Sequence, residues 1–273
     1  MANTDPKYQI GTPENKKDRN RATWITCRMT HVYSLATLLG VDGAAELVDD
    51  GIRGLRGVLH DEEHDGWYAE ITPDICHMPT KQAYAHAFVL LAASSALLAG
   101  RPGAKELLEQ AENVYLTKFW DDKIGLSVDT WDTDFAELDT YRGLNANMHS
   151  VEACLAVADV TGDESWRTRA GRIIEHVLKW AEENNWRIPE HFNSDWEPEL
   201  EFNADKPDDQ FKPYGATPGH GIEWARLITQ YALSVYGKDG VLNGDGKKYL
   251  DAAEHLFNRA VEDAWNADGA PGI

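Results

Sequence analysis

The feature that most constrains this chain is a repeated pairing of helix-length segments with different hydrophobic patterns. In the later pairs the first segment is apolar on nearly every side, as in 83–93, and the second carries an apolar stripe beside charged residues, as in 106–112. A helix that is apolar all round is buried, whereas a striped helix faces water on one side. Inner helices alternating with outer helices predict an all-α fold, a toroid of helix hairpins.

The helical periodicity gives four pairs, and a short segment rich in acidic and aromatic residues follows each of them. The expected helices are 24–39 with 43–59, 81–99 with 104–119, 147–160 with 166–180, and 221–236 with 247–264. The segments that follow the pairs are 64–68, 120–126, 185–191 and 265–271. They predict turns into short strands. The same order, found four times, indicates an internal repeat.

The number of repeats bears on the domain organisation. Four pairs do not close a ring, because the flanks of the inner helices stay exposed at both ends. Two repeats take the 137 positions from Thr80 to Thr217, so two more need about as many residues again. We therefore expect a polar N-terminal extension at 1–20 and the N-terminal part of a single barrel at 21–273. Such a part is expected to be poorly stable, since it exposes core surface.

The amino-acid composition limits the classes of molecule that the chain is expected to bind. The chain carries 26 Lys and Arg against 46 Asp and Glu, a net charge of −20. This excess of negative charge argues against nucleic acid and anionic membrane as partners. A neutral small molecule fits better. The 10 Trp and 10 Tyr favour a sugar among such molecules, because aromatic faces stack on the C–H surfaces of pyranose rings.

Cysteine usage and the N-terminus indicate a cytoplasmic protein. Cys27, Cys76 and Cys154 lie far apart and form no CxxC motif, so neither a disulfide framework nor a thiolate zinc site is predicted. The first 21 residues are polar and lack the apolar core of a signal peptide. No apolar run approaches the ~18–20 residues that a membrane span requires.

The strongest candidate site lies at 213–226, where a loop rich in glycine and proline leads into a helix. Thr217 fits the N-cap position and Pro218 the first helical position. His220 then lies in the first turn, with Glu223 one turn further on the same face and Trp224 beside it. The positive end of the helix favours a neutral imidazole, which is the form a general base needs. The alternative is a structural histidine that bonds a loop carbonyl.

A second stretch, 141–152, has the same layout. A glycine and two amides, Asn145 and Asn147, precede His149, and Glu152 follows three residues later. The loop between the two stretches adds Glu190, His191 and Phe211, the last of which lies just before the opening of the candidate helix. We expect these groups to lie at one end of the inner helices.

The first helix and the start of the third supply two further candidate groups. Trp24, Arg28 and His31 share one side of the first helix. An arginine in an otherwise apolar inner helix needs an anionic or polar partner, because burying it alone is costly. The alternative is a structural salt bridge inside the barrel. The stretch 77–82 gives a weaker signal, which a solvated helix start explains equally well.

Three other kinds of catalytic site fit less well. Two His-x-x-Glu helices raise the possibility of a dimetal site, but bundle di-iron proteins use the order Glu-x-x-His and more glutamates. We therefore predict no metal. A Ser/His/Asp triad would need a nucleophile elbow, which is missing from the sequence. A glycosidase would need two carboxylic acids flanking the bond, and the histidines would have no role.

Three motifs resemble the N-acylglucosamine 2-epimerase superfamily, and most closely its branch of aldose–ketose isomerases, the mannose and sulfoquinovose isomerases. They are Arg-Met-Thr-His at 28–31, Asn-Ala-Asn-Met-His at 145–149 and Thr-Pro-Gly-His-Gly-Ile-Glu-Trp at 217–224. The resemblance runs from about residue 24 to the last residue. It implies an (α/α)6 barrel catalytic domain, truncated here to about four of six helix pairs, with no cofactor and no metal.

The resemblance also implies roles for single residues. His220 would be one of two catalytic histidines that move a proton between C1 and C2 of a monosaccharide. Glu223 would hold a substrate hydroxyl or orient that histidine, and His149 would assist ring opening or bind the sugar. Arg28 would stabilise the enediolate that forms between the two carbons. The remaining predicted contacts are Asn145 to the substrate oxygens, and Trp24, Met148 and Trp224 to the sugar ring.

Two alternatives stay open beside an isomerase of the mannose and fructose type. A sugar 2-epimerase would use the same scaffold and return the proton to C2 from the opposite face. The second catalytic histidine of the family lies near the C-terminal end of its barrel, and this chain has no position for it. The second alternative is therefore a noncatalytic fragment that binds sugar.

Overall fold

The computed structural model describes residues 20–72, 80–209, 211–267 and 269. Nearly all of the expected N-terminal extension, together with Cys76 and His77, lies outside the described residues. The chain divides into two compact units, one formed by Met1–Val114 and Trp131–Glu137, the other by Tyr115–Thr130 and Leu138–Ile273. That residues 21–273 form part of a single barrel domain stays a prediction.

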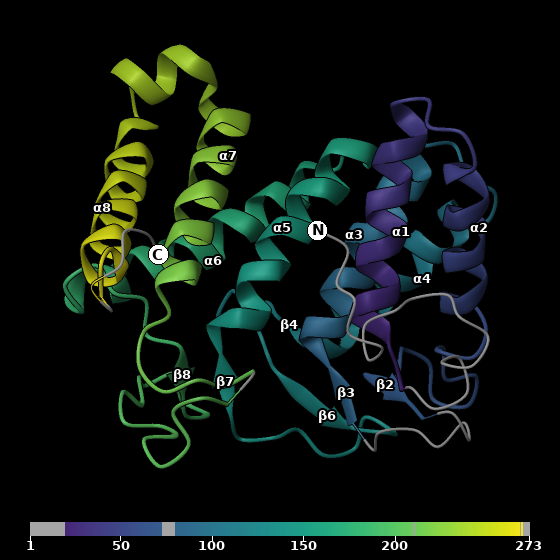
Figure 1. Ribbon diagram of the computed structural model, residues 1–273, viewed down its shortest axis with the longest axis horizontal. Helices are drawn as coiled ribbons and strands as arrows, with labels where there is room; N and C mark the ends of the chain where they lie inside the picture. Colours follow the sequence, from purple (N-terminus) through teal and green to yellow (C-terminus); the bar gives the residue numbers. More distant parts are fainter. Residues whose placement is uncertain (1–19, 73–79, 210, 268, 270–273) are drawn as a thin grey trace. The chain divides into compact units, whose positions relative to one another are not determined.

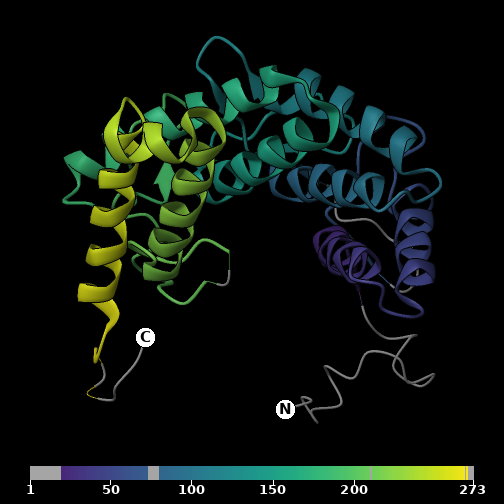
Figure 2. The same ribbon diagram turned by 90° about the horizontal axis from the view of Figure 1, so that it is seen from above.

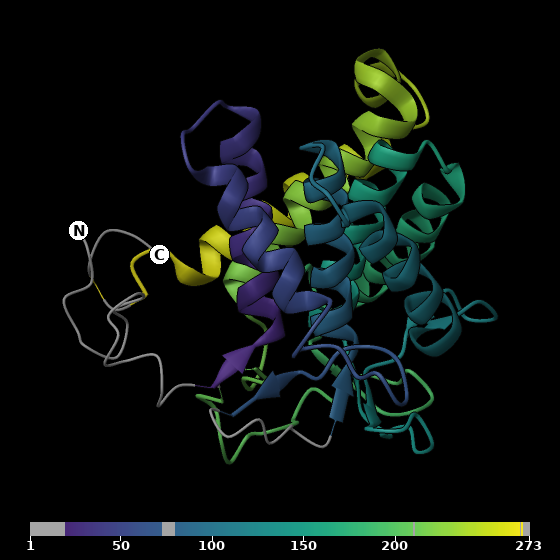
Figure 3. The same cartoon turned by 90° about the vertical axis from the view of Figure 1, so that its right-hand side faces the viewer.

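The first unit is built from two antiparallel helix hairpins, α1 with α2 and α3 with α4, and α1 also packs along α3. Figure 3 shows the first hairpin, with α1 in purple and α2 in blue. Short strands lie at the end of the unit where α1 and α3 begin (Figure 1). The elements are β1 (Arg21–Ala22), α1 (Thr23–Leu38), α2 (Ala44–Leu55), β2 (Glu70–Ile71), β3 (Thr80–Gln82), α3 (Ala83–Leu98), α4 (Ala104–Val114) and β6 (Thr130–Asp132), which pairs with β3.

The second unit repeats the plan with α5 against α6 and α7 against α8. The α7–α8 hairpin is drawn in green and yellow in Figure 2. The elements are the π-helical turn η2 (Tyr115–Phe119), β4 (Trp120–Asp121), β5 (Leu126–Ser127), β7 (Arg142–Gly143), α5 (Leu144–Thr161), α6 (Glu164–Glu183), β8 (His191–Phe192), α7 (Pro218–Asn243) and α8 (Lys247–Ala264).

Burial confirms the inner and outer helices expected in the middle of the chain. Thirteen of the 16 residues of α3 and 12 of the 18 residues of α5 are buried. By contrast, α4 and α6 bury one face each, formed by residues such as Leu107, Ala111, Ile174 and Val177. The all-α fold of helix hairpins is therefore the one that the apolar and striped patterns predict.

Two short antiparallel ladders fix the starts of two inner helices. The sequence predicted short strands after the hairpins, but it did not predict that they pair with the residues before the inner helices. β1 pairs with β2, so that Arg21 lies opposite Ile71, and β7 pairs with β8, so that Gly143 lies opposite His191. Each ladder joins the residue before an inner helix to the segment that follows the outer helix. The segment after an outer helix is therefore held beside the N-terminus of the inner helix of the same hairpin.

Some expected boundaries are wrong. The helix expected at 104–119 ends at Val114, and residues 115–119 form a π-helical turn. The end expected at 236 is confirmed, because Gly237, with φ of 65° and ψ of 175°, is not helical; a second short helical segment then runs on to Asn243. The predicted strand after the second hairpin is confirmed at β4 and β5. The segment 64–68 contributes only an isolated bridge between Trp67 and His60. Within the described part of the chain, no helix is long and apolar enough to span a bilayer.

Close packing of α1 on α2 gives a stability prediction with its own control. A Cβ on Gly51 would overlap Thr30 Oγ1 and would lie 3.1 Å from Thr30 Cβ, whereas a Cβ on Gly54 would meet Thr26 Cγ2 at an ordinary 3.9 Å. We expect Gly51→Ala to lower the free energy of unfolding by about 1–3 kcal/mol. Gly54→Ala, in the same helix, should raise it by roughly 0.5–1 kcal/mol through helix propensity. Urea unfolding followed by circular dichroism compares the two, and equal effects would contradict the packing seen here.

Candidate active site

The N-terminus of α7 places His220 where the sequence predicted it. Thr217 is the N-cap residue, with extended φ and ψ of −91° and 112°, and Pro218 opens the helix. His220 is therefore the third helical residue. The hydroxyl of Thr217 makes no capping hydrogen bond. Its backbone N–H instead points to Glu190 Oε1 at 3.4 Å.

Glu190 is the principal partner of His220. The Nδ1 atom of His220 lies 2.9 Å from one carboxylate oxygen of Glu190 and 3.0 Å from the other. The Glu190 side chain is 4% exposed and that of His220 is 21% exposed. An ionised carboxylate can only accept, so Nδ1 carries the proton and Nε2 is left as the basic atom of the neutral ring.

This pair corrects the expected charge state of His220. Burial lowers the pKa of His220, but the hydrogen bond to Glu190 and the negative charges of Glu190 and Glu223 outweigh it, so the pKa is raised above its usual value. The expectation that the helix N-terminus favours the neutral imidazole is therefore wrong in direction. A carboxylate in hydrogen-bond contact acts more strongly on an imidazole than the partial charge of a helix end.

A second imidazole–carboxylate pair lies on α5 and reaches α7. The Nδ1 atom of His149 is 3.2 Å from Glu152 Oε2, and Arg226 donates to the other oxygen of Glu152 at 2.8 Å. Burial raises the pKa of Glu152, but the hydrogen bonds and charges of His149 and Arg226 lower it to about 2. Arg226 also lies 3.7 Å from Glu223, its neighbour on α7. Glu152 thus forms an ion pair with Arg226 and accepts a hydrogen bond from His149.

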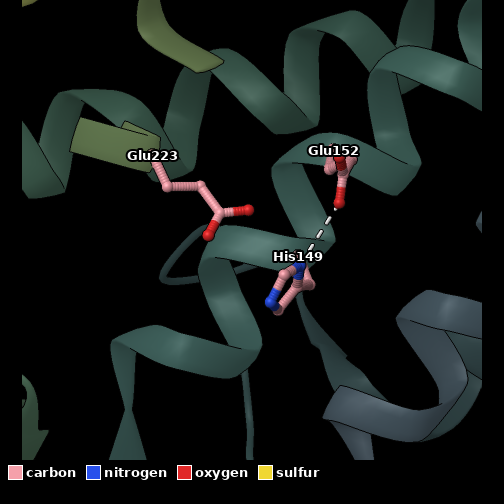
Figure 4. A group of neighbouring side chains, drawn as sticks. All are labelled: His149, Glu152 and Glu223. Atoms are coloured by element: carbon pink, nitrogen blue, oxygen red, sulfur yellow. Dashed lines mark hydrogen bonds and ion pairs between the residues drawn. The ribbon is translucent and has the colours of Figure 1, made fainter. Parts of the chain in front are cut away.

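These groups form a cluster with metal-ligating chemistry, drawn in Figure 4. One ligand atom from each of His149, Glu152 and Glu223 lies within 4.8 Å of the others. The dashed line in Figure 4 joins His149 to Glu152. Imidazole with two carboxylates is a donor set that suits zinc. However, the guanidinium of Arg226 already contacts both carboxylates and supplies the positive charge that a cation would bring.

The other predicted contacts in the second unit differ in exposure. Asn145 is half-buried, in the first turn of α5. Asn147 is buried and holds strand β5, bonding the N–H of Ser127 at 2.8 Å and its carbonyl at 3.0 Å. Met148 and Trp224 are 0% and 1% exposed. Their burial supports a role in packing, and their contact with a sugar stays a prediction.

In the first unit, Arg28 stacks between aromatic rings. Its guanidinium carbon lies 4.6 Å from the centre of the Phe88 ring and 5.2 Å from that of Trp24. It donates to the hydroxyl of Tyr84 at 3.2 Å. Among the described residues Arg28 forms no ion pair with a carboxylate, so the structural salt bridge considered from the sequence is not supported. His31, one turn further along α1, lies 2.6 Å from Ser95 Oγ.

In the stretch 77–82, the described residues 80–82 have structural roles. Lys81 is 0% exposed and donates to Asp61 at 2.7 Å, so the prediction of a solvated helix start is wrong. Gln82 is the N-cap residue of α3. Residues 77–79 lie outside the described residues.

Sequence reasoning missed how Glu190 and Arg226 act. Glu190 follows a proline in an aromatic segment and was noticed only as part of the loop before α7. Nothing local shows that the β7–β8 ladder brings it back to α7. Arg226 had a signal that could have been used, because it follows Glu223 by three residues on the same helical face.

The fold and the two imidazole–carboxylate pairs define a helix-hairpin protein with acid–base groups on its helices α5 and α7. A sequence profile of the family described as N-acylglucosamine 2-epimerase (GlcNAc 2-epimerase) matches residues 9–273. The chain therefore belongs to this family, as its motifs predicted.

Two relatives are similar over most of this chain. A protein named D-mannose isomerase from Pseudomonas cannabina pv. alisalensis is 46% identical over 253 residues, which are 92% of this chain and 60% of the relative. A second D-mannose isomerase, from Thermobifida fusca, is 45% identical over the same shares of the two chains. The chain thus spans about three fifths of the length of these curated relatives.

Solved structures give the same fold. A crystal structure of a D-mannose isomerase matches with a TM-score of 0.84 at 28% identity, covering 93% of this chain and 63% of that one. The structure of cellobiose 2-epimerase from Spirochaeta thermophila DSM 6192 matches with a TM-score of 0.74 at 19% identity, covering 90% of this chain and 61% of that one. The second likeness concerns the fold alone.

Proposed function

We propose that this chain carries acid–base residues of an aldose–ketose isomerase that interconverts mannose-type aldoses and fructose-type ketoses. The observation that carries the proposal is the hydrogen bond between His220 and the buried carboxylate of Glu190, because it leaves Nε2 of the imidazole to accept and return a proton. Support also comes from the relatives, which are named D-mannose isomerase.

In the proposed reaction Nε2 of His220 removes the proton from C2 of the open-chain aldose. The C2–H electron pair forms the C1=C2 bond of an enediolate, and the C1 carbonyl oxygen takes the negative charge. The hydroxyl proton of O2 passes to O1, the proton on Nε2 returns to C1, and O2 becomes the carbonyl oxygen of the ketose. A C2 proton is far too weakly acidic for imidazole alone, so the enediolate needs a fixed cation or donor beside it.

Roles for the other residues follow from their chemistry. Arg28 stays the predicted cation for the enediolate; its guanidinium carbon lies 4.6 Å from the centre of the Phe88 ring. His149, whose Nδ1 lies 3.2 Å from Glu152, would assist ring opening or bind the sugar. Glu223 would accept from a substrate hydroxyl. The proposed steps need no metal or cofactor, and the guanidinium of Arg226 offsets part of the negative charge of Glu152 and Glu223.

The family name supports a second candidate, a sugar 2-epimerase. The enediolate is the same, and the product depends on which carbon and which face receive the proton. Return to C2 from the opposite face needs a second acid–base group on that side of the sugar. The two activities therefore share every step up to the enediolate.

Incubation with mannose in deuterated water tests the function. We expect fructose that carries deuterium at C1, formed equally well after treatment with EDTA, because Nε2–H exchanges with solvent before it is returned. Glucose in place of fructose would establish the epimerase instead. Fructose without deuterium, in an assay that EDTA stops, would indicate a metal-assisted hydride shift. Binding of mannose without any turnover would contradict the isomerase proposal and support a noncatalytic sugar-binding fragment.

A further inference from the structure

We infer that Glu190 is a positioning residue, which fixes the ring orientation and tautomer of His220 so that Nε2 is the atom that carries the proton. The reaction served by this proton rests on the proposed function. The tautomer and orientation rest on the geometry of the second unit alone, and they are measurable without any turnover.

The contact fixes the ring because it is double and almost sealed from water. Both carboxylate oxygens of Glu190 lie within 3.0 Å of Nδ1. A neutral histidine in water is free to protonate either nitrogen, but a carboxylate at Nδ1 accepts only from N–H. With the Glu190 side chain 4% exposed, water cannot readily replace the imidazole as its donor.

Glu190 is itself held by secondary structure on both sides. Its carbonyl accepts from the N–H of Leu144, the first residue of α5, at 3.1 Å. The next residue, His191, pairs with Gly143 in the β7–β8 ladder. The ring of His191 bonds the hydroxyl of Tyr141 at 2.7 Å through Nδ1, and its Nε2 donates to the carbonyl of Pro213 at 2.7 Å. The start of α5 and the loop before α7 therefore set the place of this carboxylate.

The two imidazole–carboxylate pairs differ in how their charge is balanced. Glu152 shares its negative charge between His149 and the guanidinium of Arg226. Glu190 forms no ion pair with a lysine or arginine among the described residues, so no such cation competes with His220 for its charge. This difference indicates that His220 is the better proton carrier of the two imidazoles.

The other charged groups near the start of α7 do not take the place of Glu190 as a hydrogen-bonded charge on His220. Glu223, on the same helix, adds to the negative potential at His220. Arg226, one turn further, is committed to Glu152. On α8, which packs along α7, Arg259 and Asp263 line a small pocket with Thr217 and Pro218. Asp263 is paired there with Arg187, and Arg259 lies beside Glu262. Glu190 therefore supplies the hydrogen-bonded charge on the imidazole.

Long-range ¹H–¹⁵N correlation spectra of the histidine side chains test the proposal directly. The signals of His220 are identified by their loss in His220→Asn. In the unchanged chain we expect the Nδ1–H tautomer at high pH and a titration midpoint above the usual range for histidine. A His220 ring found as the Nε2–H tautomer would overturn the inference, whatever the enzymatic activity.

Two substitutions separate charge from orientation. Glu190→Gln keeps an oxygen acceptor for Nδ1–H but loses the negative charge, so the tautomer should persist while the midpoint falls by about one pH unit or more. Glu190→Ala should lose the tautomer preference as well. Glu199→Gln removes the same charge from an exposed position in the following loop and should change neither. Persistence of the Nδ1–H tautomer in Glu190→Ala would contradict a positioning role, since a merely structural residue would give that result. A midpoint in Glu190→Gln equal to that of the unchanged chain would contradict the effect of the Glu190 charge.

The isomerase assay of the same variants then separates the two proposals. With mannose as substrate, Glu190→Gln should lower kcat with little change in KM and shift the pH profile of kcat/KM to lower pH. If the unchanged chain shows the Nδ1–H tautomer but gives no turnover, the proposed function fails and the inference about Glu190 stands. If turnover occurs and the variants behave alike, the inference fails and the function stands.

Discussion

Replacing Lys81 with methionine is expected to lower the free energy of unfolding by about 3–5 kcal/mol, because it leaves the carboxylate of Asp61 buried without a counter-ion. The Nζ atom of Lys81 lies 2.7 Å from Asp61 Oδ2 and 2.5 Å from the carbonyl of Asp65. It also lies 4.5 Å from the centre of the Phe135 ring. The side chains of the ion pair are 0% and 3% exposed, so water cannot take the place of the lysine.

An exposed ion pair in the same unit is the matched control. Lys105 lies 3.7 Å from Glu109 on the surface of α4, and their side chains are 72% and 63% exposed. Lys105→Met should change the free energy of unfolding by less than about 0.5 kcal/mol. In the double variant Lys81→Met/Asp61→Leu most of the loss should be recovered, since neither charge is then buried alone. Equal effects of Lys81→Met and Lys105→Met in urea unfolding would contradict the importance of burial.

The same pair gives stability a dependence on pH. Burial raises the pKa of Asp61, but hydrogen bonds from Lys81 and from the N–H groups of Glu63 and His64 lower it to about 2, below the usual 3.8. A lowered folded-state pKa contributes stability that is present above pH 3.8 and is lost as the pH falls toward 2. Lys81→Met should therefore flatten the acid limb of the stability curve in this range.

Helices were predictable because their signal is local. The apolar run 83–93 and the striped run 106–112 each carry their own period, and neither depends on distant residues to be read. The start of α7 was also local, since Thr217, Pro218 and Gly219 mark a helix N-terminus by themselves. The eight α-helices of the described residues were therefore all found, with errors confined to their ends.

Hydrogen-bond partners that come from distant segments could not be predicted from local sequence patterns. Glu190 reaches His220 across 30 residues and Lys81 reaches Asp61 across 20, through ladders and turns that have no helical period. Local reasoning about His220 used the helix end and so gave the wrong direction for its pKa. The same limit explains why Lys81, which reads as a polar residue at a helix start, proves to be fully buried.

The largest effect on activity is expected at His220. His220→Asn should lower kcat/KM for mannose by on the order of 10²–10⁴-fold, which is the usual contribution of a positioned general acid–base group. Asparagine suits the test because its amide nitrogen lies about where Nδ1 lies and can still donate to Glu190. The variant therefore removes Nε2 without leaving a buried carboxylate unpaired.

The control and the pH profile make this prediction specific. His255→Asn changes an exposed imidazole on α8, stacked on Trp186 with ring centres 4.6 Å apart, and should keep nearly full activity. In the unchanged chain kcat/KM should fall as the pH drops below the pKa of His220, which Glu190 raises, because the protonated ring cannot accept the C2 proton. Mannose binding, measured by calorimetry, should persist in His220→Asn. If binding is lost along with turnover while the circular dichroism spectrum is unchanged, His220 holds the sugar and some other group moves the proton.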